Sequence, residues 1–320
     1  MGRLESPPYV MHIYTNSVFY KHDTGIGHPE NARRLDAALA GVDRAGLGVL
    51  RDVAPHPETD RIIAKVHSAD YERQLEEAAR MGMRYFHSLD NPLSSSSFAA
   101  ARTAVGTALE AADAIWRREE SDRAFVIARP PGHHAERAQA MGFCFFNTIA
   151  CAAELLREQP GIERVLIFDF DVHHGNGTQH LFEERADVYY ASTHRFPFYP
   201  GTGAATEIGI GEGRGFTRNF PLAGGEGDGP LLRIVEDEIV PILDDYRPHA
   251  ILLSAGFDAH RRDPLGGMRV TEQAFGELTR RVVEAARRHG GGRVLSLLEG
   301  GYDMEGLAAS VAEHVTALSA

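Results

Sequence analysis

Cysteine is scarce in this sequence, and long apolar runs are missing. Only Cys144 and Cys151 occur among 320 residues, which excludes a disulfide framework and favours a reducing compartment. No run approaches the roughly 18 apolar residues of a membrane span, and the first residues lack the apolar segment of a signal peptide. We therefore expect a cytoplasmic protein without membrane contacts.

A shortage of positive charge excludes a second class of partner. Lys and Arg number 33 against 45 Asp and Glu, so the net charge is -12. Nonspecific nucleic-acid binding needs basic side chains that neutralise phosphates, so we expect no nucleic-acid partner. The composition, 43% hydrophobic and 24% charged, is that of a globular protein. Because repeats and long linkers are also missing, we expect a single domain over residues 1–320.

Short apolar runs separated by helical patterns predict an α/β fold. Two of them, Val165–Phe168 and Ala250–Ser254, are apolar throughout, as strands buried on both faces of a parallel sheet are. We expect a central, mostly parallel sheet of about eight strands with helices on both faces. The runs that predict strands are Val10–Tyr14, Val49–Val53, Ala124–Ala128, Arg164–Phe170, Val188–Ser192, Phe216–Phe220, Ala250–Ser254 and Val294–Leu298.

Polar residues and prolines predict where some helices begin and end. An apolar face over residues 98–115 indicates one long helix. Asp228 predicts the start of a second helix, which Pro241 should kink or end because proline lacks the N–H and clashes with the preceding turn. Thr271 predicts the cap of a third helix, with Gly290 at its end.

Reactive side chains follow four of the predicted strands. In an open α/β sheet, ligands bind outside the carboxyl ends of the strands, so we expect these side chains to meet at one edge. They are His133 and His134 after Ala124–Ala128, Asp169, Asp171 and His173 after Val165–Phe168, Asp258 after Ala250–Ser254, and Tyr302 after Val294–Leu298.

The spacing of Asp169, Asp171 and His173 predicts a metal site. Alternate residues of an extended chain face the same side, so these three would share one face. Carboxylates and an imidazole suit Zn²⁺, and also Fe²⁺, Co²⁺ or Mn²⁺. Asp258 could supply a further ligand and still leave a coordination position for water. A buried ion-pair network at the strand end is the alternative interpretation.

His133, His134 and Tyr302 carry groups suited to acid–base chemistry. A stiff loop, Arg129–Gly132, precedes the histidine pair. We prefer one histidine as general base and the other as charge stabiliser, with metal ligation as the alternative. Opposite a metal, the Tyr302 hydroxyl could donate to a developing oxyanion; otherwise it is a packed aromatic.

Seven motifs in this order resemble the zinc-dependent histone deacetylase family. The resemblance covers most of the chain and implies the arginase/deacetylase fold. The motifs are GHPENARRL (27–35), RPPGHHA (129–135), GFCFFN (142–147), DFDVHHGNGTQ (169–179), YPGTG (199–203), SAGFDAHRRDPLGG (254–267) and LEGGYD (298–303).

The resemblance implies a hydrolytic metal site. Asp171, His173 and Asp258 match the metal ligands of the family. His134 matches the general base, and His133 matches its electrostatic partner. The implied metal is Zn²⁺, with Fe²⁺ or Co²⁺ as substitutes, and a structural K⁺ or Na⁺ ion is implied as well.

Further matches concern residues around these groups. Asp169 matches a carboxylate that orients His133 and contributes with Ser192 to the monovalent-cation site. Tyr302 matches the residue that polarises the scissile carbonyl. Arg34 matches a basic residue near the foot of the substrate tunnel.

The resemblance also implies a tunnel for the acylated side chain. Phe143, beside Gly142, and Tyr199 match its aromatic walls, and Asp90 matches a carboxylate at its rim. Tyr199 stands where phenylalanine is usual, which adds a hydroxyl to the wall. Leu265 stands where a polyamine-selective relative has a carboxylate, which weakens the case for a polyamine substrate.

Two positions bear on the branch of the family and on activity. Asn176 stands where one branch has Asp, so its hydrogen bond with His134 would be neutral, and this favours class II. Tyr302 stands where poor deacetylases of that class have His. We therefore expect a zinc-dependent deacetylase that removes acyl, chiefly acetyl, groups from lysine side chains.

Three alternatives stay open on the sequence alone. The nearest is a deacetylase of acetylpolyamines or other small N-acylated amines at the same site. An arginase-like hydrolase with two manganese ions would need further bridging carboxylates, for which Asn176 is a poor candidate. The last is a catalytically silent module that binds acyl-lysine. A homo-oligomer is equally open.

Overall fold

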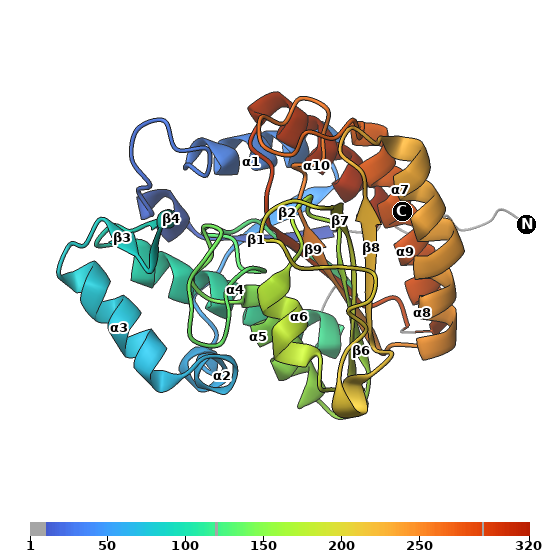
Figure 1. Ribbon diagram of the computed structural model, residues 1–320, viewed down its shortest axis with the longest axis horizontal. Helices are drawn as coiled ribbons and strands as arrows, with labels where there is room; N and C mark the ends of the chain where they lie inside the picture. Colours follow the sequence, from blue (N-terminus) through green and yellow to red (C-terminus); the bar gives the residue numbers. More distant parts are fainter. Residues whose placement is uncertain (1–10, 119–120, 290) are drawn as a thin grey trace, which may run out of the picture.

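Eight parallel strands form the central sheet of the computed structural model, which describes residues 11–118, 121–289 and 291–320 (Figure 1). The strands are β1 (Met11–Thr15), β2 (Gly48–Asp52), β5 (Arg123–Val126), β6 (Val165–Asp169), β7 (Val188–Arg195), β8 (Thr217–Leu222), β9 (Ala250–Ala255) and β10 (Val294–Leu298). Each overlaps a predicted run, although Val10 lies outside the described residues. The predicted α/β sheet is confirmed, and every pair of neighbouring strands in it is parallel.

Ten α-helices are present in the described part of the chain. They are α1 (Arg33–Ala45), α2 (Thr59–Val66), α3 (Ala69–Arg80), α4 (Ser97–Arg117), α5 (Thr148–Arg157), α6 (Asn176–Phe182), α7 (Asp228–Ile234), α8 (Val240–Tyr246), α9 (Glu272–His289) and α10 (Met304–Ser319). Short 3₁₀ turns occur at Ser17–Lys21 and Gly211–Gly213.

These helices form two layers on opposite faces of the sheet (Figure 1). One layer contains α1, α10, α9 and the α7–α8 segment, and the other contains α4, α5 and α6, with α2 and α3 packed beside them. Every residue of β5, β6, β9 and β10 is buried. Helices on both sides exclude water, which explains why these strands are continuous apolar runs.

The segment from α7 to α8 bears on the prediction that Pro241 kinks or ends a helix: Pro241 does not end one, and the helical geometry changes directly before it. A π-helical turn, Val235–Ile239, joins the two helices, and Pro241 lies in the first turn of α8. Proline is accepted there because the π-helical turn changes the hydrogen-bonding register directly before it. α7 begins at Asp228, as expected, but the Asp228 carboxylate does not cap this helix; it accepts hydrogen bonds from the Thr271 N–H at 2.7 Å and the Thr271 hydroxyl at 2.8 Å.

The other helix boundaries agree more closely with the sequence. The apolar face predicted over residues 98–115 lies in α4, most of whose alanines are buried. α9 begins directly after Thr271, the position predicted for its cap, and the Thr271 hydroxyl donates to Asp228. Gly290, the predicted end of this helix, lies outside the described residues.

The strand order brings four carboxyl ends together at the centre of the sheet. The order is β2-β1-β5-β10-β9-β6-β7-β8, so β5, β10, β9 and β6 are neighbours. The loops after them carry His134, Tyr302, Asp258 and His173 respectively. Residues that are distant in the sequence therefore meet at the edge where α/β proteins bind ligands.

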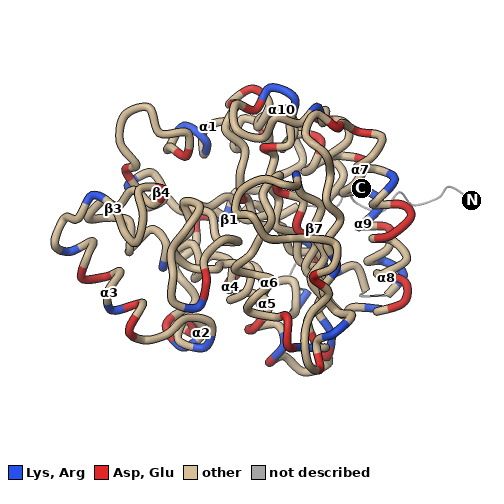
Figure 2. Tube along the Cα trace, in the orientation of Figure 1, with Lys and Arg blue, Asp and Glu red and all other residues tan. Residues whose placement is uncertain are grey.

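The outer surface mixes charges of both signs. Figure 2 shows acidic and basic positions side by side along α3 and α9. On α9, Arg280 pairs with Glu277 at 2.7 Å and with Glu284 at 2.5 Å. A two-stranded hairpin, β3 (Tyr85–Phe86) and β4 (Ser88–Pro92), lies outside the main sheet. Among the described residues, no helix combines the length and apolar character needed to cross a membrane.

Candidate active site

Three buried side chains that follow β6 and β9 form a cluster suited to a metal ion. The ligand atoms of Asp171, His173 and Asp258 all lie within 4.8 Å of one another. His173 Nδ1 lies 3.1 Å from Asp171 Oδ1 and 3.1 Å from Asp258 Oδ2. Buried carboxylates are costly unless a cation neutralises them. Two oxygens and one imidazole nitrogen match a catalytic zinc site with three protein ligands.

Backbone amides hold the carboxylates of this cluster in place. Gly300 N donates to Asp171 Oδ2 at 2.8 Å, and Val172 N donates to Asp258 Oδ1 at 2.9 Å. In Asp258, one oxygen is therefore held by an amide while the other faces His173. In Asp171, both oxygens accept from amides, because the His173 N–H also donates to Oδ1 at 2.9 Å. A Cβ atom on Gly300 would lie 2.2 Å from Asp258 Oδ2, so only glycine allows this close approach. These residues fit a divalent cation.

Asp169 lies outside the cluster, which corrects the inference from alternating spacing. It is the last residue of β6, and the chain leaves the extended conformation after it. Its Oδ2 lies 3.0 Å from His133 Nδ1 and accepts a hydrogen bond from the Tyr190 hydroxyl at 3.2 Å. Alternation holds only while a strand continues, so Asp171 and His173 are placed by a bend instead.

His134 is held as a neutral imidazole. Its Nδ1 lies 2.8 Å from Asn176 Oδ1, while Asn176 Nδ2 donates to the Glu136 carboxylate on its other side. The Asn176 oxygen therefore accepts the Nδ1 proton, and Nε2 keeps its lone pair. Burial, with the neighbouring His133 and His173, lowers the pKa of His134 well below its ordinary value. His134 can thus accept a proton at Nε2.

His133 has the opposite electrostatic surroundings. Burial opposes its charged form, but the carboxylates of Asp169 and Asp171 outweigh burial and raise the pKa of His133 to about 10. Its ring centroid lies 4.0 Å from that of His134. A positive charge on one ring disfavours a second positive charge on the other, so this contact helps to keep His134 neutral.

Glu299 is a buried carboxylate that the sequence analysis missed. Its Oε2 accepts hydrogen bonds from the N–H groups of Gly132 at 2.7 Å and His133 at 3.2 Å, which fixes the loop after β5. Burial raises the pKa of Glu299 to about 7. The residue directly follows β10, so the rule that singled out Tyr302 after the same strand would also have found it.

Contacts to the backbone and ring hold Tyr302 beside the cluster. The Tyr302 N–H donates to Asp263 Oδ2 at 2.7 Å, and Arg34 Nε donates to the Gly301 carbonyl at 2.7 Å. The Arg34 guanidinium lies 5.0 Å from the Tyr302 ring centroid, and the Phe143 ring meets Tyr302 edge-on at 5.9 Å. These contacts involve the Tyr302 N–H, the neighbouring Gly301 carbonyl and the Tyr302 ring, and none of them uses the Tyr302 hydroxyl.

Arg34 belongs to a fully buried ion-pair cluster. Glu30 contacts Arg34 at 3.2 Å and accepts two hydrogen bonds from Arg129, one of them at 2.6 Å. None of the three side chains has any exposed surface. Arg34 also donates to the Glu299 carbonyl. The cluster therefore ties the segment before α1 to the loops after β5 and β10, below the Tyr302 ring.

A narrow cavity of about 130 Å³ adjoins the metal-suited cluster. The residues that line it are Asp90, His134, Gly142, Phe143, His173, Tyr199, Leu265 and Tyr302. The structure therefore brings together all five residues that the sequence placed along a substrate tunnel. Their individual roles stay predictions.

A tight turn presents Phe143 to this cavity. Gly142 and Phe143 have φ angles of 56° and 70°, and Cys144 N donates to the Met141 carbonyl at 2.9 Å. Two positive φ angles between these residues are the pattern of a type I′ turn. A Cβ atom on Gly142 would lie 2.2 Å from the His134 ring. Glycine is thus needed for the turn to pack against the candidate base.

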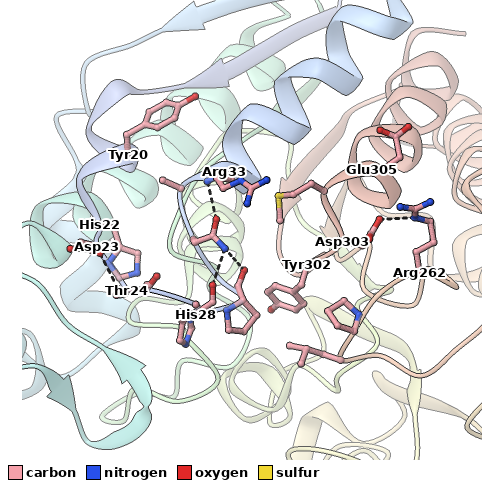
Figure 3. A pocket seen from close by; sticks show the side chains of 18 residues that line it. Tyr20, His22, Asp23, Thr24, His28, Arg33, Arg262, Tyr302, Asp303 and Glu305 are labelled. Carbon is pink, nitrogen blue, oxygen red and sulfur yellow. Dashed lines mark hydrogen bonds and ion pairs between the residues drawn. The ribbon is translucent and has the colours of Figure 1, made fainter.

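A wider cleft of about 1060 Å³ opens beside the narrow cavity (Figure 3). The two share Leu265 and Tyr302. Figure 3 shows Tyr302 between His28 on one side and the Arg262–Asp303 ion pair, 2.9 Å long, on the other. A substrate whose side chain occupies the narrow cavity would have room in this cleft for its larger part.

Ser192 lies near Asp169 without contacting it through its hydroxyl. The two residues are paired in register on β6 and β7. The Ser192 Oγ lies 2.8 Å from His194 Nδ1, and His194 Nε2 lies 2.8 Å from the Gly203 carbonyl. The monovalent-cation site that the resemblance implies for Asp169 and Ser192 stays a prediction.

The chain is similar to proteins described as deacetylases. A family model of the histone deacetylase domain matches residues 28–318. A probable deacetylase of Archaeoglobus fulgidus is 36% identical over 298 residues, or 92% of this chain and 82% of that protein. A histone deacetylase-like amidohydrolase of Pseudomonas aeruginosa is 40% identical over 278 residues, or 86% and 71%. The crystal structure of the HDA15 HD domain matches with a TM-score of 0.90 at 34% identity, over 97% of this chain and 89% of that one.

Proposed function

This chain belongs to the histone deacetylase family, and on that premise we propose that it is a metal-dependent hydrolase of acetylated lysine side chains in proteins or peptides. One observation carries the proposal. The neutral His134 and the Tyr302 ring line the same narrow cavity as His173, a member of the metal-suited cluster. A base, a hydrogen-bond donor and a metal site around one small cavity suit hydrolysis of an amide.

Asp171, His173 and Asp258 would hold the ion, which we propose is Zn²⁺, with Fe²⁺ or Co²⁺ as substitutes. When bound, the ion supplies Lewis-acid polarisation of the acyl carbonyl and lowers the pKa of water toward about 7. The other steps belong to side chains of the chain itself. A monovalent cation near Asp169 and Ser192 is part of the same proposal.

His134 would move the protons of the reaction. Its Nε2 accepts a proton from water as the water oxygen bonds to the acyl carbon. The Tyr302 hydroxyl donates to the carbonyl oxygen as negative charge develops there. The carbon–nitrogen bond then breaks, and His134 returns the proton to the leaving nitrogen. The products are a free amine and a carboxylate. His133, oriented by Asp169, acts as the electrostatic partner.

The proposed substrate class is tested by a comparison of two acetylated amines. The cavity walls include Phe143, Tyr199 and Leu265, and a cationic polyamine stem would lose hydration against them. We therefore expect acetyl- or trifluoroacetyl-lysine peptides to exceed acetylputrescine in kcat/KM. The rate of carboxylate release measures both substrates in one assay. The reverse order would favour the small-molecule alternative, and absence of hydrolysis with either would favour a silent binding module.

Tyr302→Phe is expected to lower kcat by about 10²–10³ while KM hardly changes. The hydroxyl bonds most strongly to the charge that appears only in the transition state, so ground-state binding is little affected. Steady-state kinetics with an acetyl-lysine peptide provide the measurement. The phenylalanine ring keeps the contacts with Arg34 and Phe143, so the melting temperature should be preserved.

Affinity for a hydroxamate that chelates the metal separates this effect from damage to the site. The variant should bind the hydroxamate about as tightly as the wild type, because Asp171, His173 and Asp258 are untouched. Unchanged turnover in Tyr302→Phe would show that the residue is a packed aromatic. Loss of hydroxamate binding would mean that the ring supports the cluster instead.

The proposed place of action is a reducing compartment, the cytoplasm. Both cysteines are free and buried, so a disulfide contributes nothing to this fold. Burial raises the pKa of both thiols, which keeps them protonated and unreactive. The proposed partner is the acylated substrate itself.

A further inference from the structure

Arg195, the last residue of β7, carries a half-buried side chain that the proposed reaction does not use. β7 is the neighbour of β6 in the sheet, so Arg195 lies beside the loop that carries Asp171 and His173. In the described part of the chain, its guanidinium contacts a carbonyl and an aromatic ring but forms no ion pair with a carboxylate. An ion pair therefore does not account for the position of this arginine.

Two hydrogen bonds connect Arg195 to the segments that carry the candidate metal ligands. Its backbone N–H donates to the carbonyl of Val172, the residue between the two candidate ligands after β6, at 2.9 Å. Its Nη1 donates to the Gly266 carbonyl at 3.2 Å. Gly266 packs so closely against the Asp258 carbonyl that a side chain would not fit there. One arginine therefore contacts both ligand-bearing segments.

The aromatic ring of Phe198 connects the guanidinium of Arg195 with the imidazole of His173. The Arg195 Cζ atom lies 4.0 Å from the Phe198 ring centroid, which is the geometry of a cation–π contact. The Phe198 ring is stacked on the His173 ring, with 5.3 Å between the centroids and 14° between the planes. Offset stacking of this kind is a favourable arrangement of two aromatic rings. Arg195, Phe198 and His173 together form the arginine stack.

The His173 imidazole lacks the hydrogen bond that normally orients a metal ligand. Its Nδ1 lies 3.1 Å from both carboxylates of the cluster, and among the described residues its Nε2 has no hydrogen-bond partner. Metal-ligating histidines usually donate their second ring N–H to a carboxylate, a carbonyl or water, which fixes the plane of the ring. Stacking on Phe198 can fix this plane instead, because a rotated ring would lose the parallel contact.

We propose, resting on the metal site of the proposed function, that Arg195 and Phe198 are positioning residues that hold the His173 imidazole in the orientation that binds the divalent cation. A ring that is already oriented loses less conformational freedom when the ion binds, so the arginine stack should raise the affinity for the metal. The positive charge of Arg195 acts in the opposite direction, because it repels the cation. Substitutions that change one of the two effects at a time separate them.

The affinity of metal-free protein for Co²⁺ tests the positioning role. It is measured from the visible absorption of the bound ion, in competition with a chelator. Arg195→Lys keeps the charge but loses the planar guanidinium, and it should weaken Co²⁺ binding by about 3- to 10-fold, the usual worth of one stacking or cation–π contact. Phe198→Leu removes the ring that contacts His173 and should weaken binding by a similar factor. Phe198→Tyr keeps the ring and should bind Co²⁺ as the wild type does.

Two results would overturn the inference. Tighter binding in Arg195→Met, which removes the charge and the planar group together, with wild-type affinity in Arg195→Lys would show that the arginine acts through its charge alone. Wild-type affinity in Phe198→Leu would show that the ring does not orient His173. The melting temperature of each metal-free variant shows that the compared proteins are folded.

Arg218→Lys is the matched control. The Arg218 guanidinium lies over the Phe220 ring on β8, with 5.7 Å between Cζ and the ring centroid, and neither residue belongs to the metal-suited cluster or lines its cavity. This variant loses the same kind of contact and should bind Co²⁺ as tightly as the wild type. Equal weakening in Arg218→Lys and Arg195→Lys would mean that the affinity follows general stability, which would overturn the positioning role.

The same titration separates this inference from the function on which it rests. A wild-type protein that binds no Co²⁺, or binds it equally well after Asp258→Ala, would overturn the proposed metal site and the inference with it. A wild-type protein whose Co²⁺ binding is lost in Asp258→Ala but is unchanged in Arg195→Lys and Phe198→Leu would overturn the inference alone.

Discussion

Removal of the metal by a chelator such as dipicolinate is expected to abolish hydrolysis of acetyl-lysine peptides, and added Zn²⁺ or Co²⁺ should restore it. We expect this because Asp171, His173 and Asp258 form a cluster in which the three candidate ligand atoms lie within 4.8 Å of one another. Without a cation, two buried carboxylates face each other across one imidazole, and no Lewis acid is present to activate the water. Activity and metal content should be measured on the same samples, before and after reconstitution.

Substitutions connect this effect to the cluster. Asp258→Ala should lose both the metal and the activity, because it removes one of two carboxylate ligands. Asp90→Asn changes an exposed carboxylate at the cavity and should retain the metal. A metal content near one per chain fits the cluster, whereas a content near two would favour the binuclear alternative. Full turnover in metal-free protein would refute the metal assignment.

His134→Ala should lower kcat by about 10²–10⁴, the usual contribution of general acid–base catalysis, and should lose more than His133→Ala. The difference follows from their surroundings. His134 is neutral with Nε2 available, whereas His133 Nδ1 lies 3.0 Å from Asp169, which favours its charged form. Single-turnover rates at pH 7 with an acetyl-lysine peptide give the comparison without interference from product release.

The metal content of both histidine variants decides between a base and a ligand. Neither residue belongs to the metal-suited cluster, so both variants should retain the ion. Loss of the ion from either variant would make that histidine a ligand. The pH profile adds a check on the sign of the shift. Because the pKa of His134 is lowered, the acidic limb of kcat/KM in the wild type should lie below pH 6.5, the ordinary value for histidine.

The central strands were predictable from the sequence because β6 and β9 contain continuous apolar runs between polar segments. The arginase/deacetylase fold expected from the motifs is confirmed by the structural match with the HDA15 HD domain. The convergence of side chains followed from the rule on strand ends alone. The alternation of Asp169, Asp171 and His173 gave the wrong prediction that all three share one face. The strand ends at Asp169, and alternation requires an extended chain.

Most of the features that could not be predicted from the sequence depend on long-range contacts. Arg129 was noted only as part of a stiff loop, yet its side chain is fully buried against Glu30, which is 99 residues away. No local pattern predicts such a pair. The π-helical turn before Pro241 was not predictable for a different reason, since such a turn depends on packing rather than on residue propensity.

The position of the last strand has a consequence for how the chain is made. β10, which ends 22 residues before the C-terminus, lies in the middle of the sheet between β5 and β9. During synthesis, the half-sheets β2-β1-β5 and β6-β7-β8 therefore exist before the strands that join them, each with an open edge that can pair wrongly. The nascent chain cannot close its sheet, or complete its active site, until β10 and the Tyr302 loop after it have left the ribosome.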